Sequence, residues 1–291
     1  MSIENYMYKF TPVKGFWFTK PLVDMLVGIS GCIETTLDIG LTKTRVCIEN
    51  NTVILDDLKI PLVEVEPSEE DRVVFYDIES DAIYEVLRST TSGYYKLKAV
   101  GFDKAPTIEI NGIHMHRIAG TDPWRDTLEK IKAASIRSND VVLDTCTGLG
   151  YTAIASVMYG AREVYTIEID ENVLWIAQRN PWSTGLSSNA IKVFHADSTE
   201  LVRKLPDSYF TKIIHDPPRF TKSTGDLYSL EFYLELYRVL KRGGVLFHYT
   251  GEPRIHGPSI LKGVRDRLEK AGFRVLRFDK KALGFIAVKT V

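Results

Sequence analysis

The chain has 291 residues, with 37 basic against 38 acidic side chains and 44% apolar content. This composition is typical of a globular protein and excludes a disordered or collagen-like chain. The net charge of −1 argues against a general nucleic-acid coat or a membrane-surface protein. The charge is nevertheless divided, because 12 basic and 18 acidic residues precede Ile118 and 25 basic and 20 acidic follow, giving net charges of −6 and +5. Two solvated surfaces account for this division, although a polyanionic substrate on the second part also fits.

The cysteines and the apolar runs bear on where the protein is found. Cys32, Cys47 and Cys146 are odd in number and show no CxxC spacing, so neither a disulfide framework nor a zinc ribbon is indicated. The first residues lack a signal-peptide pattern, and no apolar run approaches the roughly 18 residues of a membrane span. We expect a cytoplasmic protein that is neither secreted nor inserted in a membrane.

Residues 1–117 are predicted to form a smaller, mainly β domain. Short strands alternate with turn residues, and two hairpins are expected around Asn50-Asn51 and Asn111-Gly112. One short helix is expected over residues 80–88. The sequence leaves the purpose of this domain open between presenting a substrate and pairing two protomers in a homodimer.

From Asp122 onward, strand and helix patterns alternate, which predicts an α/β catalytic domain over residues 118–291. The near-continuous apolar strands indicate a parallel sheet covered by helices on both faces. Helices are expected over 122–134, 153–159, 173–179, 230–240 and 260–270, and strands over 141–143, 164–167, 191–194, 210–214 and 245–249. The last two strands, 273–278 and 285–288, are too close in sequence for a crossover helix and should pair antiparallel.

Four acidic residues follow four successive strands: Asp144, Glu168, Asp197 and Asp216. Because ligands of open α/β sheets bind at the carboxyl ends of the strands, we expect these acids to converge on one ligand site. Each acid alone is more often a helix cap or a turn residue, but four in this order make coincidence the poorer explanation.

The loop after the first of these strands contains Gly148 and Gly150 and opens directly into a helix. Glycines let a ligand approach the main chain, and a helix start can bind an anionic group. Glu168 follows Gly148 by 20 residues, so its carboxylate can accept both ribose hydroxyl hydrogens of a nucleoside. Asp197 can accept a hydrogen bond from an adenine amino group.

The stretch from Val141 to Val288 resembles class I S-adenosylmethionine-dependent methyltransferases, in particular a group of archaeal predicted methyltransferases with an Asp-Pro-Pro-Arg-Phe motif. The resemblance implies a seven-stranded Rossmann-like sheet with a reversed last strand and S-adenosyl-L-methionine as cofactor. The cofactor-binding residues it implies are Asp144, Thr145, Cys146, Gly148, Gly150, Glu168, Ile169 and Asp197. Cys146 replaces the usual first glycine, and we interpret it as a packing substitute because no partner activates its thiolate.

Asp216-Pro217-Pro218 resembles the motif of enzymes that methylate exocyclic amino groups. There the acid and a proline carbonyl accept hydrogen bonds from the amine, which orients its lone pair for in-line attack. We therefore predict Asp216, Pro217 and Arg219 as the catalytic residues. Arg219 occupies the place of the usual stacking aromatic, so it can stack or grip a phosphate while Phe220 lies in the core. The sequence leaves open whether Arg219 or Phe220 replaces the stacking aromatic.

The expected reaction is methyl transfer to an amino nitrogen, with RNA (tRNA or rRNA) as the leading substrate and a small amine second. An aminopropyltransferase is the closer rival, since polyamine synthases share the sheet and carry a small β domain. An NAD-dependent oxidoreductase fits the GxGxxA spacing, but Asp144 precedes Gly148 by four residues and Asp-Pro-Pro has no role in hydride transfer. A catalytically inactive nucleoside-binding module is the third alternative. No metal site is expected, and His195, His215 and His248, which lie in or at the ends of the parallel strands, are interpreted as structural.

Overall fold

The computed structural model describes residues 3–251 and 253–290, with side chains described outside 253–259. The chain forms two compact units. The first contains Met1–Phe10, Arg125–Glu171 and Leu186–Val291, and the second contains Thr11–Trp124 and Asn172–Gly185. The sequence predicts a single division between residues 117 and 118. It does not predict that the chain up to Phe10 groups with the C-terminal part or that 172–185 group with the N-terminal part.

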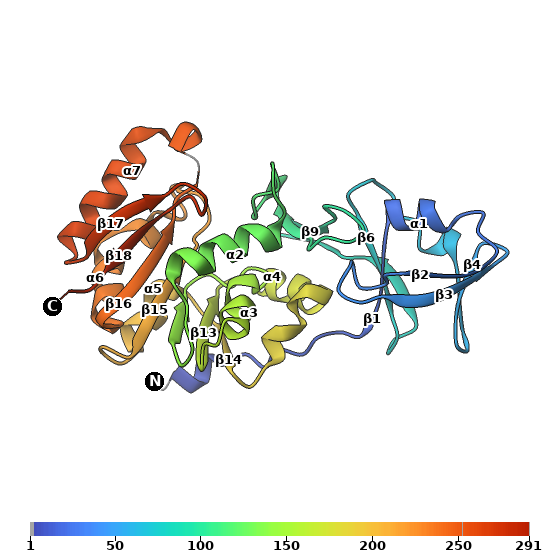
Figure 1. The fold of residues 1–291 in the computed structure, drawn as a ribbon, viewed down its shortest axis with the longest axis horizontal. Coiled ribbons are helices and arrows are strands. Elements are labelled where there is room, and N and C mark those ends of the chain that lie inside the picture. The colour runs from blue at the N-terminus through green and yellow to red at the C-terminus, as the bar shows by residue number, and fades with distance from the viewer. Residues whose placement is uncertain (1–2, 252, 291) are drawn as a thin grey trace. The chain divides into compact units, whose positions relative to one another are not determined.

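The first unit is built on a seven-stranded sheet (Figure 1). Its strands run in the order β14 (Ile191–His195), β13 (Glu163–Glu168), β12 (Val141–Asp144), β15 (Phe210–His215), β16 (Leu240–Tyr249), β18 (Gly284–Val288) and β17 (Arg274–Asp279). The pairs from β14 to β16 are parallel, whereas β18 is antiparallel to both β16 and β17. This arrangement confirms the expected mixed sheet and the antiparallel pairing of the last two strands.

The five helices predicted for the second half are present as α2 (Pro123–Ala134), α3 (Tyr151–Met158), α4 (Glu171–Gln178), α6 (Leu230–Val239) and α7 (Pro253–Lys270). The structure also contains the short helix α5 (Ser198–Leu201), which the sequence did not predict. Helix α3 packs on β12, β13 and β14, while Leu236 of α6 and Leu268 of α7 belong to a buried core that includes Leu143 and Leu246 of the sheet. The start of the chain adds to the β14 edge, where the Tyr8 amide donates to the Val193 carbonyl at 2.8 Å.

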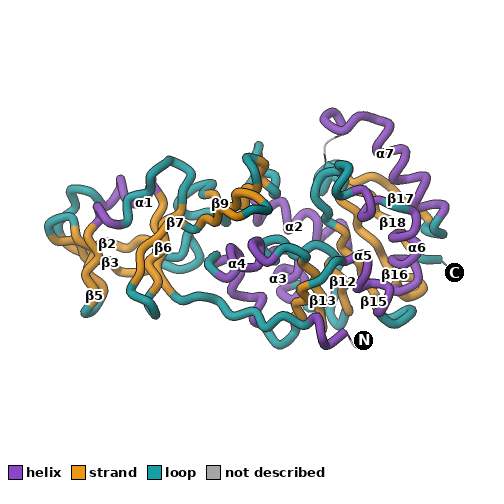
Figure 2. Tube along the Cα trace, turned by 180° about the vertical axis from the view of Figure 1, so that it is seen from behind, coloured by secondary structure: helices purple, strands orange, loops and turns teal. Residues whose placement is uncertain are grey.

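The second unit is mainly β and contains three small antiparallel sheets (Figure 2). One comprises β1 (Gly15–Thr19), β6 (Val73–Asp77) and β7 (Ala82–Glu85); one comprises β2 (Gly31–Thr35), β3 (Thr44–Glu49), β4 (Thr52–Leu55) and β5 (Leu58–Pro61); the third comprises β8 (Leu87–Thr90), β9 (Gly93–Lys98), β10 (Thr107–Ile110) and β11 (Ile113–His114). A short helix, α1 (Lys20–Leu26), packs near β1. Both predicted hairpin turns are confirmed, with positive φ at Asn50, Asn51, Asn111 and Gly112.

Two expectations for this unit are wrong. Residues 80–88 form a turn and the strands β7 and β8 rather than a helix, because Ala82–Glu85 pairs with β6 and Asp81 adopts a φ of 53° in the turn before it. Cys32 and Cys47 form a disulfide, because they are register partners on the adjacent antiparallel strands β2 and β3. Because two of the three cysteines form a disulfide, the cysteines do not support a reducing compartment. The cytoplasmic location stays a prediction. Among the described residues, no helix is both long and apolar enough to cross a membrane.

Candidate active site

The four acids lie at the same end of the sheet. Asp144 and Glu168 are the last residues of β12 and β13, and Asp197 and Asp216 follow β14 and β15. These strands are parallel neighbours, so their carboxyl ends form one edge, and the strand order reverses between β12 and β15. Such a switch point is where open α/β sheets bind ligands.

Asp144 is completely buried at this edge. Its Oδ2 accepts hydrogen bonds from the Thr152 hydroxyl at 3.0 Å and the Thr166 hydroxyl at 2.8 Å. Its Oδ1 has no hydrogen-bond partner among the described residues, although it is shielded from solvent. Burial raises the pKa of Asp144 to about 7. A buried carboxylate oxygen without a donor fits a cationic ligand group, such as the ammonium of an amino-acid moiety.

The two glycines of the adjoining loop serve different purposes. Gly148 has a φ of 53°, and a Cβ placed there would meet nothing within 4 Å. Gly150 has a φ of 78°, and a Cβ there would lie 2.5 Å from Leu186. Gly148 therefore leaves open space beside the main chain where a ligand can approach, whereas Gly150 permits close packing at the start of α3.

Glu168 is anchored by main-chain donors. Its Oε2 accepts from the Gly148 amide at 2.9 Å, and its Oε1 accepts from the Asp170 amide at 3.0 Å. Burial raises its pKa to about 7, and these amides oppose that rise. The next residue, Ile169, is 63% exposed, so its side chain offers an apolar surface beside the carboxylate.

The remaining cofactor candidates make mainly structural contacts. Asp197 caps α5, with Oδ1 accepting from the amide and the hydroxyl of Thr199, both at 2.7 Å. The Thr145 hydroxyl lies 2.7 Å from His215 Nδ1. Burial raises the pKa of the Cys146 thiol well above its usual range, in agreement with a packing role rather than a thiolate.

Asp216 forms an ion pair that the sequence analysis missed. Its Oδ2 lies 2.6 Å from Lys130 Nζ, which also lies 3.1 Å from Asp126 Oδ2 and 4.2 Å from the centre of the Tyr249 ring. Burial alone would lower the pKa of Lys130, but the charges of Asp216 and Asp126 outweigh burial and raise it. The i,i+4 spacing of Asp126 and Lys130 on α2 was the available signal, but no sequence pattern links that helix to β15.

The loop after Asp216 contains the other predicted catalytic residues. Pro217 is buried, and the Pro218 carbonyl accepts a hydrogen bond from the Tyr228 hydroxyl at 2.8 Å. Arg219 is exposed. Phe220 is 47% exposed and meets Tyr228 edge-on at 5.3 Å, so the alternative that places its ring in the core is wrong. An exposed aromatic ring thus lies four residues beyond Asp216.

Each of the three histidines contacts a polar group of the protein. His215 and His248 are completely buried, with ring centres 4.4 Å apart. His215 Nε2 lies 2.9 Å from the Leu227 carbonyl, and His248 Nε2 lies 2.6 Å from the Tyr233 hydroxyl. Burial lowers the pKa of His215 to about 3, so it stays neutral. His195 is exposed, and its Nε2 lies 3.1 Å from the Ile169 carbonyl oxygen.

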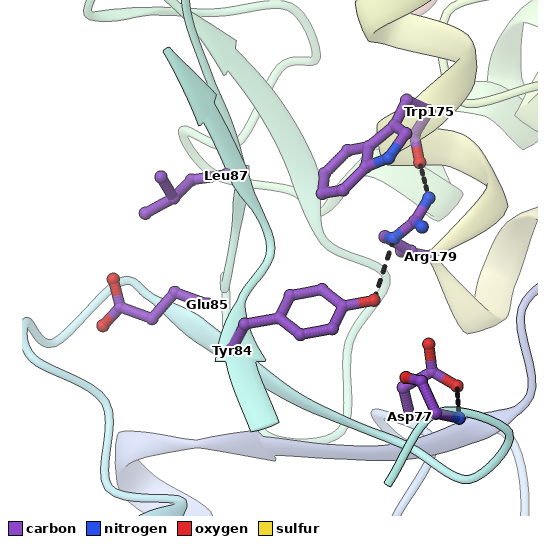
Figure 3. A pocket seen from close by; sticks show the side chains of 7 residues that line it. Asp77, Tyr84, Glu85, Leu87, Trp175 and Arg179 are labelled. Atoms are coloured by element: carbon purple, nitrogen blue, oxygen red, sulfur yellow. Dashed lines mark hydrogen bonds between the residues drawn. The ribbon is translucent and has the colours of Figure 1, made fainter. Parts of the chain in front are cut away.

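A separate hollow of about 740 Å³ lies on the second unit (Figure 3). Its lining includes Tyr84, Trp175 and Arg179. The Arg179 guanidinium stacks 3.8 Å from the Trp175 ring centre and donates through Nε to the Tyr84 hydroxyl at 3.0 Å. These contacts hold α4 residues against β7, and none of the four strand-end acids lines the hollow.

Comparisons with known proteins show the family and the fold relatives of this chain. A family described as "Conserved hypothetical protein 95" matches residues 120–270. The chain belongs to that family. It is also 48% identical to the uncharacterized protein MJ1233 of Methanocaldococcus jannaschii over 70% of this chain and 71% of the relative.

More distant relatives are enzymes of the methyltransferase fold superfamily. The chain is 21% identical to polyamine aminopropyltransferase 2 of Aquifex aeolicus over 92% of its length, a match that spans 54% of that enzyme. A ribosomal RNA large subunit methyltransferase of Aeromonas hydrophila also matches, at 26% identity over 48% of this chain and 37% of that enzyme. Spermidine synthase from Thermotoga maritima shares the fold, with a TM-score of 0.53 and 16% identity over 100% of this chain and 85% of that one.

Proposed function

We propose that the protein is an S-adenosylmethionine-dependent methyltransferase that acts on an amino nitrogen. The observation that carries the proposal is the place of Asp216, a carboxylate at the end of β15 on the same sheet edge as Asp144 and Glu168. The archaeal group with the Asp-Pro-Pro-Arg-Phe motif stays part of this proposal.

The residues of the strand-end edge fit this cofactor. Glu168 would hold the ribose hydroxyls, the orphaned Oδ1 of Asp144 would accept from the methionine ammonium, and the space beside Gly148 would admit the methionine moiety. Thr145 and Cys146 on the loop after β12, and Ile169 directly after β13, would line the cofactor site, and Asp197 would meet the adenine. Carboxylates suit a cofactor with a sulfonium and an ammonium group, whereas a pyrophosphate would be repelled by them. This contrast disfavours a dinucleotide.

When bound, the cofactor supplies an electrophilic methyl group on its sulfonium sulfur. Asp216, as a carboxylate, accepts a hydrogen bond from the amine and orients its lone pair toward that methyl group. The Pro217 carbonyl is the second acceptor in this proposal. In this proposal the amine loses one proton after transfer, and the Asp216 carboxylate receives it.

An RNA base is the favoured methyl acceptor, and a small amine is second. Phe220 is an exposed ring on the loop that carries Asp216, and Arg219 beside it is also exposed. An aromatic ring can stack on a splayed base, and a guanidinium can pair with a phosphate. The N-terminal domain, residues 1–117, would present the substrate or pair two protomers.

Aminopropyl transfer is the second candidate, favoured by the alignment of the Aquifex aeolicus enzyme over 92% of this chain. In that reaction Asp216 would deprotonate an attacking amine. The two candidates differ in whether the cofactor carries the methionine carboxylate.

The experiment that tests the proposal is mass spectrometry of modified nucleosides in RNA from a strain that lacks the gene. The proposal predicts that one N-methylated base is missing and returns with the wild-type gene but not with the Asp216→Ala variant. Unchanged RNA together with loss of a polyamine would favour aminopropyl transfer.

A further inference from the structure

We propose that Lys130 is a positioning residue for the reaction: it binds one oxygen of Asp216 and keeps that carboxyl charged, which leaves the other oxygen for the amine. This inference rests on the proposed function, because it takes the role of Asp216 to be accepting a hydrogen bond from the substrate amine. Asp126 is the second member of the arrangement, since it shares the ammonium of Lys130.

The geometry supports a dedicated arrangement rather than a chance surface pair. The Lys130 side chain is 3% exposed and that of Asp126 is 1% exposed. Lys130 reaches Asp216 from α2, whereas Asp216 follows β15, so two elements far apart in sequence meet at this contact. A buried pair of this kind strongly affects the charge state of its members.

The two carboxylate oxygens of Asp216 differ in their hydrogen bonding. Lys130 Nζ bonds to Oδ2 at 2.6 Å. No hydrogen bond among the described residues uses Oδ1, and the Asp216 side chain keeps 18% of its surface exposed. One oxygen is therefore fixed by the protein, and the carboxyl still reaches the solvent through which a substrate would arrive.

The two members on α2 act on Asp216 in opposite directions. The pKa of Asp216 is raised overall, because burial raises it most; the positive charge of Lys130 opposes that rise, and the negative charge of Asp126 adds to it. The other titratable groups in electrostatic reach come from three further parts of the fold: Asp144 and Cys146 at the end of β12, Tyr228 of η5 (Gly225–Tyr228), and Tyr249 of β16, which contacts Lys130.

The test is carbon-13 NMR titration of the Asp216 side-chain carboxyl in the full-length protein, assigned by its loss in Asp216→Asn. In Lys130→Met the midpoint should rise by about one pH unit or more. In Asp126→Asn it should fall, and Lys130→Arg should stay close to wild type. Lys132→Met is the matched control, because that lysine lies on the same helix but is 57% exposed and pairs with Glu129.

Opposite shifts in Lys130→Met and Asp126→Asn would support the proposal, because general loosening of the site would move both variants in the same direction. An unchanged midpoint in Lys130→Met, or a rise in Asp126→Asn, would overturn it. If Lys130→Met does not fold, the sign of the shift in Asp126→Asn decides. Calorimetry with S-adenosylmethionine is run in parallel, so that failure of cofactor binding is read separately from failure of the Lys130 assignment.

Discussion

Lys130 on α2 and Asp216 after β15 form a buried ion pair with 2.6 Å between Nζ and Oδ2. The pair places a fixed positive charge against the carboxylate that ends the fourth parallel strand. Because Asp216 also borders the sheet edge that carries Asp144 and Glu168, the charge state of this edge determines which ligands it can accept.

The two glycines after β12 should respond differently to alanine. In Gly150→Ala, the positive φ and the contact 2.5 Å from Leu186 should lower the free energy of unfolding by about 2–4 kcal/mol. Gly148→Ala should cost only about 1–2 kcal/mol of stability, because only its φ is strained. The Gly148 variant should nevertheless bind S-adenosylmethionine roughly tenfold more weakly or worse. Urea unfolding and calorimetry measure the two effects, and equal cofactor affinity in Gly148→Ala and wild type would contradict the assignment.

The cofactor should bind more weakly as the pH falls from about 7 to 5.5. Asp144 and Glu168 each have a pKa near 7, so both become protonated over this range and lose the negative charge that attracts a cation. Each group should weaken binding by roughly tenfold at the acidic end. Calorimetry across this range checks the trend, and Glu168→Gln should show a shallower dependence than wild type. Affinity that does not change with pH would count against both carboxylates as ligands.

The raised pKa values of Asp144 and Glu168 also determine how the free energy of unfolding of the cofactor-free protein changes with pH. Both carboxyls hold their protons to higher pH in the folded protein than in the unfolded chain, whose ordinary values are 3.8 and 4.5. Their contribution to the free energy of unfolding is therefore complete below about pH 4 and is lost as the pH rises toward 7 and above. Thermal melting of Asp144→Asn should show less of this loss than wild type.

Phe220 and Arg219 should contribute in distinguishable ways to binding of an RNA acceptor. Phe220→Ala should raise KM, because it removes a stacking contact worth about 1–3 kcal/mol. The size of this rise should depend little on the salt concentration. Arg219→Ala should also raise KM. This rise should be smaller at high salt concentration, because salt screens the contact between the guanidinium and a phosphate. Methyl-transfer kinetics at two salt concentrations separate the two. A normal KM in both variants would exclude this loop from acceptor binding.

Much of the second half of the chain could be predicted from its sequence. Apolar runs such as Val141-Val142-Leu143 are buried strands, and the six residues between the last two strands left room only for an antiparallel pair. The strand-end places of Asp144, Glu168, Asp197 and Asp216 follow from that alternation, because parallel strands share their carboxyl edge.

What escaped prediction depends on contacts between distant segments. The partnership of Lys130 with Asp216 spans 86 positions and leaves no trace in local spacing. The Cys32–Cys47 disulfide depends on the register of β2 and β3, which places the two residues directly opposite each other. Residues 80–88 carry a pattern compatible with a helix, but pairing of Ala82–Glu85 with β6 overrides that local preference.

The measurement that tests the central proposal most directly is calorimetric titration of the purified protein with S-adenosylmethionine, decarboxylated S-adenosylmethionine and NAD. Methyl transfer predicts that S-adenosylmethionine binds most tightly and that Asp216→Ala keeps nearly the same affinity while losing turnover, by roughly 100-fold or more. Tighter binding of the decarboxylated compound would favour aminopropyl transfer. No heat with S-adenosylmethionine, together with tight binding of NAD, would contradict the proposed function.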